Sequence, residues 1–173
     1  MNYYIADMHL GHENIIAFDN RPFRSVNEMN RVLMDNWNRK VGQDDDVYIL
    51  GDFSYCSETD PVWYLEQLKG TKHLIQGNHD GHLLRSGNAG KYLASVDKML
   101  HITDGGEHIV LCHFPIAEWN GFSHGSWHIY GHIHGNVSKT SKFMKGRKKA
   151  LNAGCMLNGY EPVTFAELVE NNK

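Results

Sequence analysis

The sequence predicts an α/β domain whose second half is mostly antiparallel. In the first half, short apolar runs alternate with helical patterns, which is typical of βαβ units and a central sheet. The second half is a series of short β-rich segments, and Asp104-Gly105-Gly106 between two of them predicts a tight hairpin turn. At 173 residues, with no internal repeat or linker, the chain is expected to form a single domain over residues 1–173.

Two helices and three strands are expected in the first half. The helix over 25–41 begins with a capping box, Ser25 with Glu28 three residues later, and carries an apolar stripe at helical spacing. The helix over 60–68 has Pro61 in its first turn. The expected strands are residues 3–7, 47–52 and 72–80, and each runs into a carboxylate or amide at its end.

The second half is expected to contain five strands. Apolar, aromatic and β-branched residues are concentrated in each of them. They are residues 96–102, 107–113, 127–132, 150–154 and 163–169.

The composition narrows the class of protein. With 17 Lys and Arg against 20 Asp and Glu, the formal charge is −3, which argues against a protein that coats nucleic acid through a general positive charge. The three cysteines have no Cys-x-x-Cys spacing, so they indicate neither a disulfide framework nor a zinc knuckle. Since no apolar run approaches the ~20 residues of a membrane span, we expect a cytoplasmic protein without a membrane partner.

Polar side chains follow the expected strands at the points where they end. Each of these turns, taken alone, is more often an ordinary turn, a cap or a half-buried imidazole. In open α/β sheets, however, binding residues collect where strands leave the sheet, and five such turns in one chain indicate a shared site. The residues are Asp7 and His9, Asp52, Asn78 with His79 and Asp80, His113, and the pair His132 and His134.

The donor set indicates two metal ions. Mixed nitrogen and oxygen donors suit Mn, Fe, Co, Ni or Zn, whereas all-oxygen sites suit Mg or Ca. Asp7, His9, Asp52, Asn78, His113, His132 and His134 are too many ligands for one tetrahedral ion. A pair of ions can clamp an in-line phosphoryl displacement and lower the pKa of bound water toward ~7.

In this order, and over most of the chain, the motifs resemble those of the calcineurin-like metallophosphoesterases. The resemblance implies a four-layer αββα sandwich, with two mixed β-sheets flanked by helices. It implies two metal ions, manganese among the candidates, and a bridging role for Asp52. One metal would be held by Asp7, His9 and His134, and the other by Asn78, His113 and His132.

The resemblance also implies how the site works. A hydroxide bridging the two metals would be the nucleophile, and His79 would contact the phosphate or protonate the leaving oxygen, with Asp80 orienting His79. The residues themselves are compatible with this, because His79 adjoins a ligand without being one and a nearby carboxylate would favour its protonated form.

Three functions follow from these residues. The first is a phosphodiesterase acting on a nucleotide-type substrate, a nucleotide or an oligonucleotide, and the alternative is a phosphomonoesterase using the same site. An inactive protein-binding scaffold is the third, although it would be expected to have lost ligands and none is missing. After Gly51-Asp52 the chain continues Phe53-Ser54-Tyr55 instead of the Asp-Arg-Gly of protein Ser/Thr phosphatases, so a small bacterial or phage-type phosphoesterase is the nearer resemblance. No protein partner is evident, and the oligomeric state is left open.

Several residues near the motifs have two interpretations each. His12 and Asn14 either contact substrate and support a metal ligand, or are polar residues of a helix cap. His124 and Trp119 either form a rim that selects the leaving group, or belong to an exposed loop. At the last motif, the backbone is expected to turn between Gly131 and Gly135, so that each of its two imidazoles serves a different metal.

One cationic run, residues 139–150, is expected to form a hairpin tip near the active-site edge. It contains Lys139, Lys142, Lys145, Arg147, Lys148 and Lys149. It either steers phosphate or nucleic acid or forms a solvated turn, and the net negative charge of the protein favours the turn.

Overall fold

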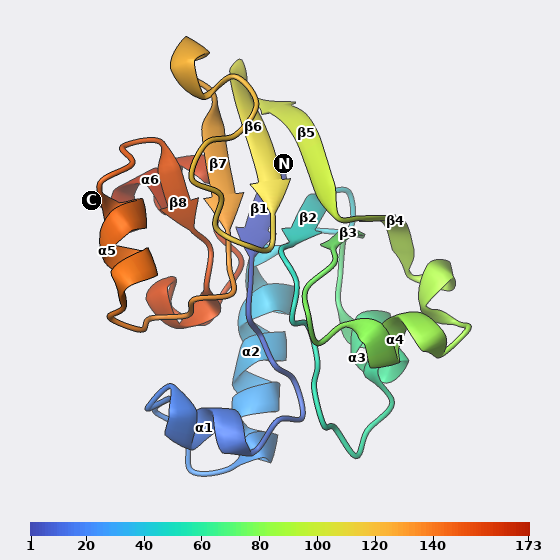
Figure 1. Cartoon of the computed structure of the whole chain (residues 1–173). Coiled ribbons are helices and arrows are strands. Elements are labelled where there is room, and N and C mark those ends of the chain that lie inside the picture. Colours follow the sequence, from blue (N-terminus) through green and yellow to red (C-terminus); the bar gives the residue numbers. More distant parts are fainter.

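Two four-stranded sheets pack face to face in the computed structural model, which describes residues 1–173 (Figure 1). The first sheet has the order β1-β2-β3-β4, and all its pairs are parallel. Its strands are β1 (Asn2–Ile5), β2 (Asp46–Ile49), β3 (Thr71–Ile75) and β4 (Leu93–Asp97). The second has the order β5-β6-β7-β8, built from β5 (Met99–Asp104), β6 (Glu107–Cys112), β7 (Trp127–Tyr130) and β8 (Ala150–Asn152).

Helices cover the outer faces of both sheets. α2 and α3 pack on the first sheet, and α5 packs on the second through Met144, which lies against Val110 and Tyr130. The helices are α1 (Asn14–Phe18), α2 (Val26–Lys40), α3 (Pro61–Gln67), α4 (Gly81–Arg85), α5 (Lys139–Lys145) and α6 (Phe165–Asn171). The predicted αββα sandwich is confirmed, except that its first sheet is wholly parallel instead of mixed.

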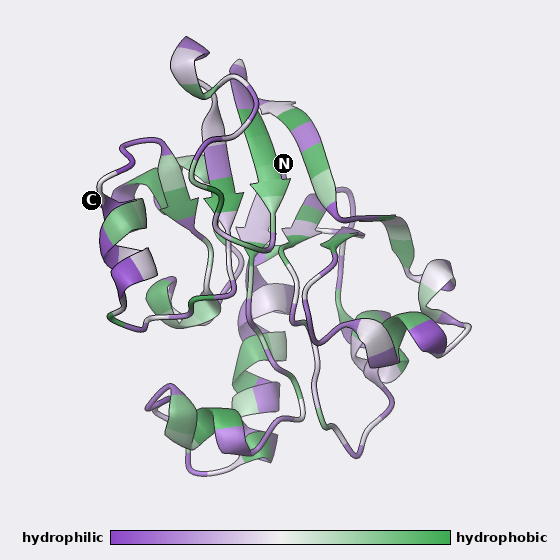
Figure 2. Cartoon of the chain, in the orientation of Figure 1, coloured by the Kyte–Doolittle hydropathy of each residue, from purple (hydrophilic) through white to green (hydrophobic).

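The alternation of side chains along the strands explains the layers. In β1, Tyr3 and Ile5 face the helices, whereas Tyr4 lies between the two sheets. Strand β6 is largely hydrophobic, as its green colour shows (Figure 2), because both of its faces are covered, whereas the edge strand β5 has exposed and half-buried residues in alternation. None of the helices combines the length and the hydrophobicity needed to cross a bilayer.

Helix α2 begins where its sequence predicts. The Ser25 hydroxyl accepts a hydrogen bond from the Glu28 backbone N–H (3.2 Å), while the Glu28 carboxylate accepts from the backbone N–H of Arg24 instead of that of Ser25 (2.7 Å). One hydrogen bond of the predicted capping box is therefore present, and the return bond from Glu28 goes to the residue before the N-cap. Helix α3 likewise begins at Pro61, and the Asp60 carboxylate caps it.

Apart from the cationic run 139–150, the second half differs from the prediction in three respects. The expected strand 96–102 is two strands, because the chain leaves the first sheet after β4 and enters the second with β5. Only β5 and β6 pair antiparallel, joined by the predicted turn at Gly105 and Gly106, whereas β6, β7 and β8 are parallel. The expected strand 163–169 is helix α6, and the Thr164 and Glu167 side chains cap its first turn.

Parallel strands bring the metal-site candidates to one end of the sandwich. β1, β2 and β3 point the same way, and in Figure 1 the arrowheads of β6 and β7 point to the end where the connecting loops meet. Backbone hydrogen bonds join these loops across the chain, from Asp7 N–H to Gly51 O (3.1 Å) and from Gly131 N–H to His113 O (2.9 Å). The expected strand 72–80 ends at Ile75, so Asn78, His79 and Asp80 lie in a loop at this end.

Candidate metal centre

The loops after β1 and β2 and the loop after β7 bring four candidate ligands into one cluster. One ligand atom from each side chain lies within 4.8 Å of the ligand atoms of all the others. The first sheet supplies three of them and the second sheet supplies the fourth. The four residues are Asp7, His9, Asp52 and His134.

A second group of candidate ligands lies beside the first. The Asn78 side-chain oxygen is 3.0 Å from His113 Nε2 and 3.0 Å from His132 Nδ1. Asp52 Oδ2 lies between the two groups, 3.6 Å from His9 Nε2 and 3.6 Å from His113 Nε2. The structure therefore brings all seven candidate ligands together, with Asp52 at the junction.

Hydrogen bonds on the outer side of the imidazoles fix which nitrogen faces inward. His113 Nδ1 donates to the Leu50 carbonyl (2.7 Å), so in the neutral ring the lone pair is on Nε2. That lone pair faces the Asn78 oxygen, which is also an acceptor. Two acceptors at this distance need a proton or a cation between them.

The imidazole of His9 is buried without any hydrogen-bond partner. It is 2% exposed, and neither Nδ1 nor Nε2 is bonded to another group. Burial lowers the pKa of His9 to about 2 and raises the pKa of Asp7 to about 6. A neutral imidazole is the form that binds a metal, and an unsatisfied buried nitrogen is costly unless a ligand uses it. The side chains present therefore fit a bound divalent cation.

Five of the seven candidate ligands have left-handed backbone conformations. Their φ angles are 56° at Asp7, 51° at His9, 53° at Asp52, 70° at His132 and 51° at His134. Asp and His tolerate this region better than most residues but seldom adopt it. In each of these loops the left-handed residue turns the chain sharply, and this is how successive side chains reach a common point.

Gly77 and Gly131 leave room for neighbouring groups and have no positive φ, whereas Gly51 has a φ of 78°. A Cβ on Gly131 would lie 2.6 Å from the Ala6 side chain, and a Cβ on Gly77 would lie 2.5 Å from Asp52 Oδ1. The expected turn between Gly131 and Gly135 is present, but neither of these glycines has a positive φ. The histidines between them carry the left-handed conformation themselves.

No hydrogen bond joins the Asp80 carboxylate to the His79 ring, which the prediction had paired. The two carboxylate oxygens of Asp80 accept hydrogen bonds from the backbone N–H groups of Asp52 (3.0 Å), Phe53 (2.9 Å) and Gly77 (2.7 Å). Asp80 is fully buried, and burial raises the pKa of its carboxyl group. Asp80 therefore fixes the backbone on either side of Asp52, and the His79 ring has no carboxylate partner.

A cavity of about 560 Å³, here called the metal-side cavity, opens over the ligands. The His79 ring packs on Tyr55, with 4.0 Å between ring centroids, and its side-chain nitrogens have no partner within the protein. The His12 ring stands edge-on to Tyr55 (4.9 Å), with its Nδ1 buried and unbonded. Phe18 and the predicted Asn14 also line this cavity.

Sequence reasoning did not identify Asp19 and Arg21, which support the ligands from behind. Both Asp19 oxygens accept from His134 Nδ1 (2.9 Å each), which leaves His134 Nε2 free to face Asp7. The buried Arg21 guanidinium donates to Asp19 and to the backbone carbonyls of Asp7 and Met8 (2.8 Å each). Because Asp19 and His134 lie 115 positions apart, no local spacing could have linked them.

Two predicted rim residues do not reach the site. His124 lies before β7, at the opposite end of that strand from His132, and lines a different cavity. Trp119 is buried, and its indole N–H donates to the Ser126 carbonyl (3.1 Å). It packs against the outer face of the second sheet, so the rim is formed instead by Phe18 and Tyr55.

Comparisons with known proteins place the chain among relatives. No family model matches it. The uncharacterized protein MJ1445 of Methanocaldococcus jannaschii is 34% identical over 176 residues, which cover 99% of this chain and 92% of MJ1445. This chain belongs to the MJ1445 family. The gene 66 protein of Mycobacterium phage L5 is a more distant relative of this chain. The two are 28% identical over 159 residues, which cover 76% of each protein.

A solved structure has the same fold as this member of the MJ1445 family. The protein of unknown function AQ665 from Aquifex aeolicus superposes with a TM-score of 0.77 and 25% sequence identity, over 98% of both chains. The near-complete coverage means that the sandwich, including its site loops, corresponds to the whole of that structure. The names of these proteins state no activity, so the function has to be argued from the site.

Proposed function

We propose that this protein is a binuclear metal-dependent phosphodiesterase of the calcineurin-like metallophosphoesterase type, acting on nucleotide-type substrates. The observation that carries the proposal is the convergence of seven oxygen and nitrogen ligands from both sheets around Asp52, with both His9 ring nitrogens buried and unbonded. Asp7, His9 and His134 would hold one divalent ion and Asn78, His113 and His132 the other, with Asp52 shared.

When bound, the two ions would neutralise the phosphate charge and lower the pKa of a water molecule. The side chains around them have separate tasks. His79 faces the same cavity without being a ligand, so its ring is free to donate a proton to the leaving oxygen. Asp80 holds the Asp52 and Gly77 backbone in place. The cavity is open at the side of Phe18 and Tyr55, which leaves room for a substituent on the phosphate and supports a diester substrate.

A metal-reconstituted activity screen tests the proposal. The protein would be stripped with a chelator, reloaded separately with Mn, Zn, Fe, Co or Ni, and assayed with bis(p-nitrophenyl) phosphate, p-nitrophenyl phosphate, cyclic nucleotides, dinucleoside polyphosphates and oligonucleotides. We expect kcat/KM for the diester to exceed that for the monoester by about tenfold or more, equivalent to ~1.4 kcal/mol of transition-state binding. A preference for the monoester would establish the alternative, and inactivity with every metal would favour the scaffold.

Asp19 should set the metal affinity through His134. Replacing Asp19 with Asn removes the anionic partner of the imidazole, so we expect the affinity for one metal to fall by about 10- to 100-fold. Metal titration of the stripped protein measures this, with Asp35→Asn on the exposed face of α2 as the control. Excess metal should restore kcat, because the ligands themselves remain. Unchanged metal affinity in Asp19→Asn would contradict the assigned role.

A further inference from the structure

A second cavity, of about 530 Å³, adjoins the metal-side cavity. It lies between α5, β8 and the end of the chain, and is here called the α5 cavity. His134 and Asn136 line both cavities, so the two adjoin beside the candidate metal centre. In Figure 1, α5 and the C-terminus lie next to each other on this side of the second sheet.

The α5 cavity is lined by cations and by no Asp or Glu side chain. Its cationic residues are Lys142, Lys145, Arg147, Lys148 and Lys173. Of these, only Lys173 forms an ion pair, with Glu170. Lysines elsewhere, such as Lys91 and Lys98, also form no ion pair, so the feature that distinguishes this cavity is the grouping of five cations on one concave surface. A concave surface with unpaired charges of one sign concentrates its electric field and attracts an anion of extended shape.

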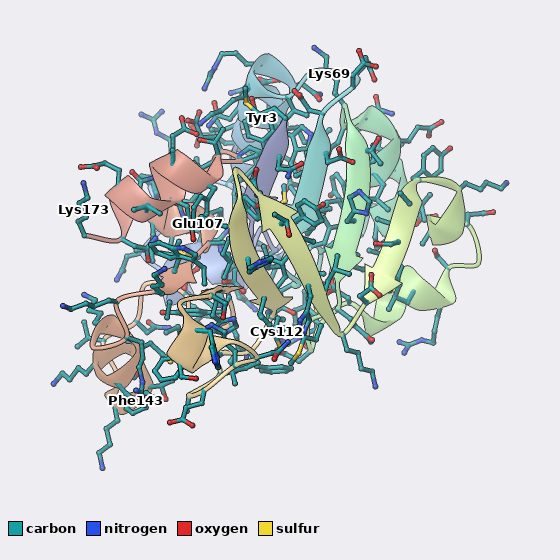
Figure 3. The ribbon with its side chains drawn as sticks, turned by 90° about the horizontal axis from the view of Figure 1, so that it is seen from above. Tyr3, Lys69, Glu107, Cys112, Phe143 and Lys173 are labelled. Atoms are coloured by element: carbon teal, nitrogen blue, oxygen red, sulfur yellow. The ribbon has the colours of Figure 1, made fainter.

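The geometry of α5 differs from the predicted hairpin tip and strengthens this interpretation. The run 139–145 is a helix capped by Ser138, so its lysines have a regular spacing along one element. The Arg147 guanidinium lies over the Phe143 and Phe122 rings, at 4.6 and 5.1 Å from their centroids, and is held near the cavity without a carboxylate. In Figure 3, Phe143 and Lys173 lie on the same side of the molecule, away from Lys69.

Exposed aromatic rings lie on the other side of the metal centre. Phe18 is 69% exposed and Tyr55 is 36% exposed, and the His12 ring lies between them at 6.2 and 4.9 Å. Aromatic faces next to a cationic groove are the combination that binds single-stranded nucleic acid, because the bases of a single strand are free to stack. A base pair would keep its bases away from these rings.

We propose that the α5 cavity binds the phosphate backbone of a single-stranded nucleic acid, one of whose phosphodiesters reaches the metal centre while a neighbouring base stacks on Phe18 or Tyr55. The cleavage of the bound strand rests on the proposed function, whereas the binding of the strand does not. It makes an oligonucleotide the substrate class, in preference to a free nucleotide, since only a chain of nucleotides has further backbone phosphates to occupy the α5 cavity.

Binding is tested without metal, so that it is separate from hydrolysis. A labelled single-stranded oligonucleotide of about 10 nucleotides would be titrated in chelator over a series of salt concentrations, and its anisotropy measured. The test variant combines Lys142→Gln, Lys145→Gln and Lys148→Gln. The control combines Arg31→Gln, Lys91→Gln and Lys98→Gln, three exposed cations outside both cavities with the same change of charge.

We expect the slope of log K against log salt to become shallower by roughly 2 in the test variant, about 0.7 for each phosphate that is no longer neutralised, and to stay unchanged in the control. Phe18→Ala should weaken binding of the single strand by about tenfold and leave binding of a duplex of the same sequence unaffected. Equal slopes for wild type and test variant, or duplex binding as tight as that of the single strand, would overturn the inference.

A ratio of activities connects binding to cleavage. With metal, kcat/KM for the oligonucleotide divided by kcat/KM for bis(p-nitrophenyl) phosphate should fall by about tenfold or more in the test variant and remain constant in the control. If the small diester is turned over and the ratio is unchanged, the proposed function stands and the α5 cavity does not bind the oligonucleotide substrate. Charge-dependent binding of the single strand by a protein that hydrolyses no ester would reject the function and keep the binding site.

Discussion

Replacing Asp52 with Asn is expected to lower kcat on every substrate by on the order of 10³-fold or more and to reduce the amount of bound metal. Asp52 Oδ2 lies 3.6 Å from an imidazole nitrogen of each ligand group, and Oδ1 accepts the His79 backbone N–H (2.9 Å). Asn can preserve the second contact, and it tolerates the left-handed backbone. What it removes is the negative charge that the two proposed ions would share.

The comparison for Asp52→Asn is Asp35→Asn, which makes the same chemical change on the exposed face of α2. Metal content measured by elemental analysis and kcat should both be normal in this control. If Asp52→Asn retained its full metal content and turned over at nearly the wild-type rate, Asp52 would not bridge two metals and the binuclear assignment would fail.

Replacing His79 with Ala should leave both metals bound and slow the reaction by about 10²- to 10³-fold for diesters with poor leaving groups. The ring lines the metal-side cavity, makes no hydrogen bond within the protein and is not among the proposed ligands. A leaving group that is a weak base needs little protonation, so the loss should be much smaller for p-nitrophenol than for an alkoxide. A plot of log kcat against leaving-group pKa measures this difference.

His108→Ala, at an exposed position of the β5–β6 hairpin, is the control for His79→Ala and should leave the slope of that plot unchanged. The same loss for good and poor leaving groups would assign His79 to phosphate binding and remove it as the proton donor. Loss of metal from His79→Ala would instead show that the ring supports a ligand.

Local sequence patterns predict the elements whose ends and faces are encoded nearby. Helix α2 has both a cap and an apolar stripe, and the β5–β6 turn has two glycines with positive φ. Helix α6 resembles a strand in sequence because β-branched and aromatic residues at 163–165 outweigh its capping box. Helix α5 has one buried residue, Met144, so it shows almost no apolar stripe.

The candidate ligands can be found from sequence because parallel strands carry the residues at their ends to one edge. That argument uses only the order of strands, so it identifies residues such as Asp52 and His113 without any knowledge of distances. Asp19 and Arg21 are brought to His134 by the fold alone, and nothing in their own neighbourhood distinguishes them from an ordinary turn. Asp80 belongs to a motif that the sequence reveals, but its three backbone partners can be seen only in the structure.

The left-handed conformation of five candidate ligands implies a conflict between folding and activity. A residue other than glycine in this region costs on the order of 1 kcal/mol or more, so five of them cost roughly as much as the smallest net stability of a domain, about 5 kcal/mol. Glycine would relieve this cost at each position and would delete the ligand. Selection for stability alone would therefore erode these loops, and their present composition is the part of the sequence that only the function of the protein can maintain.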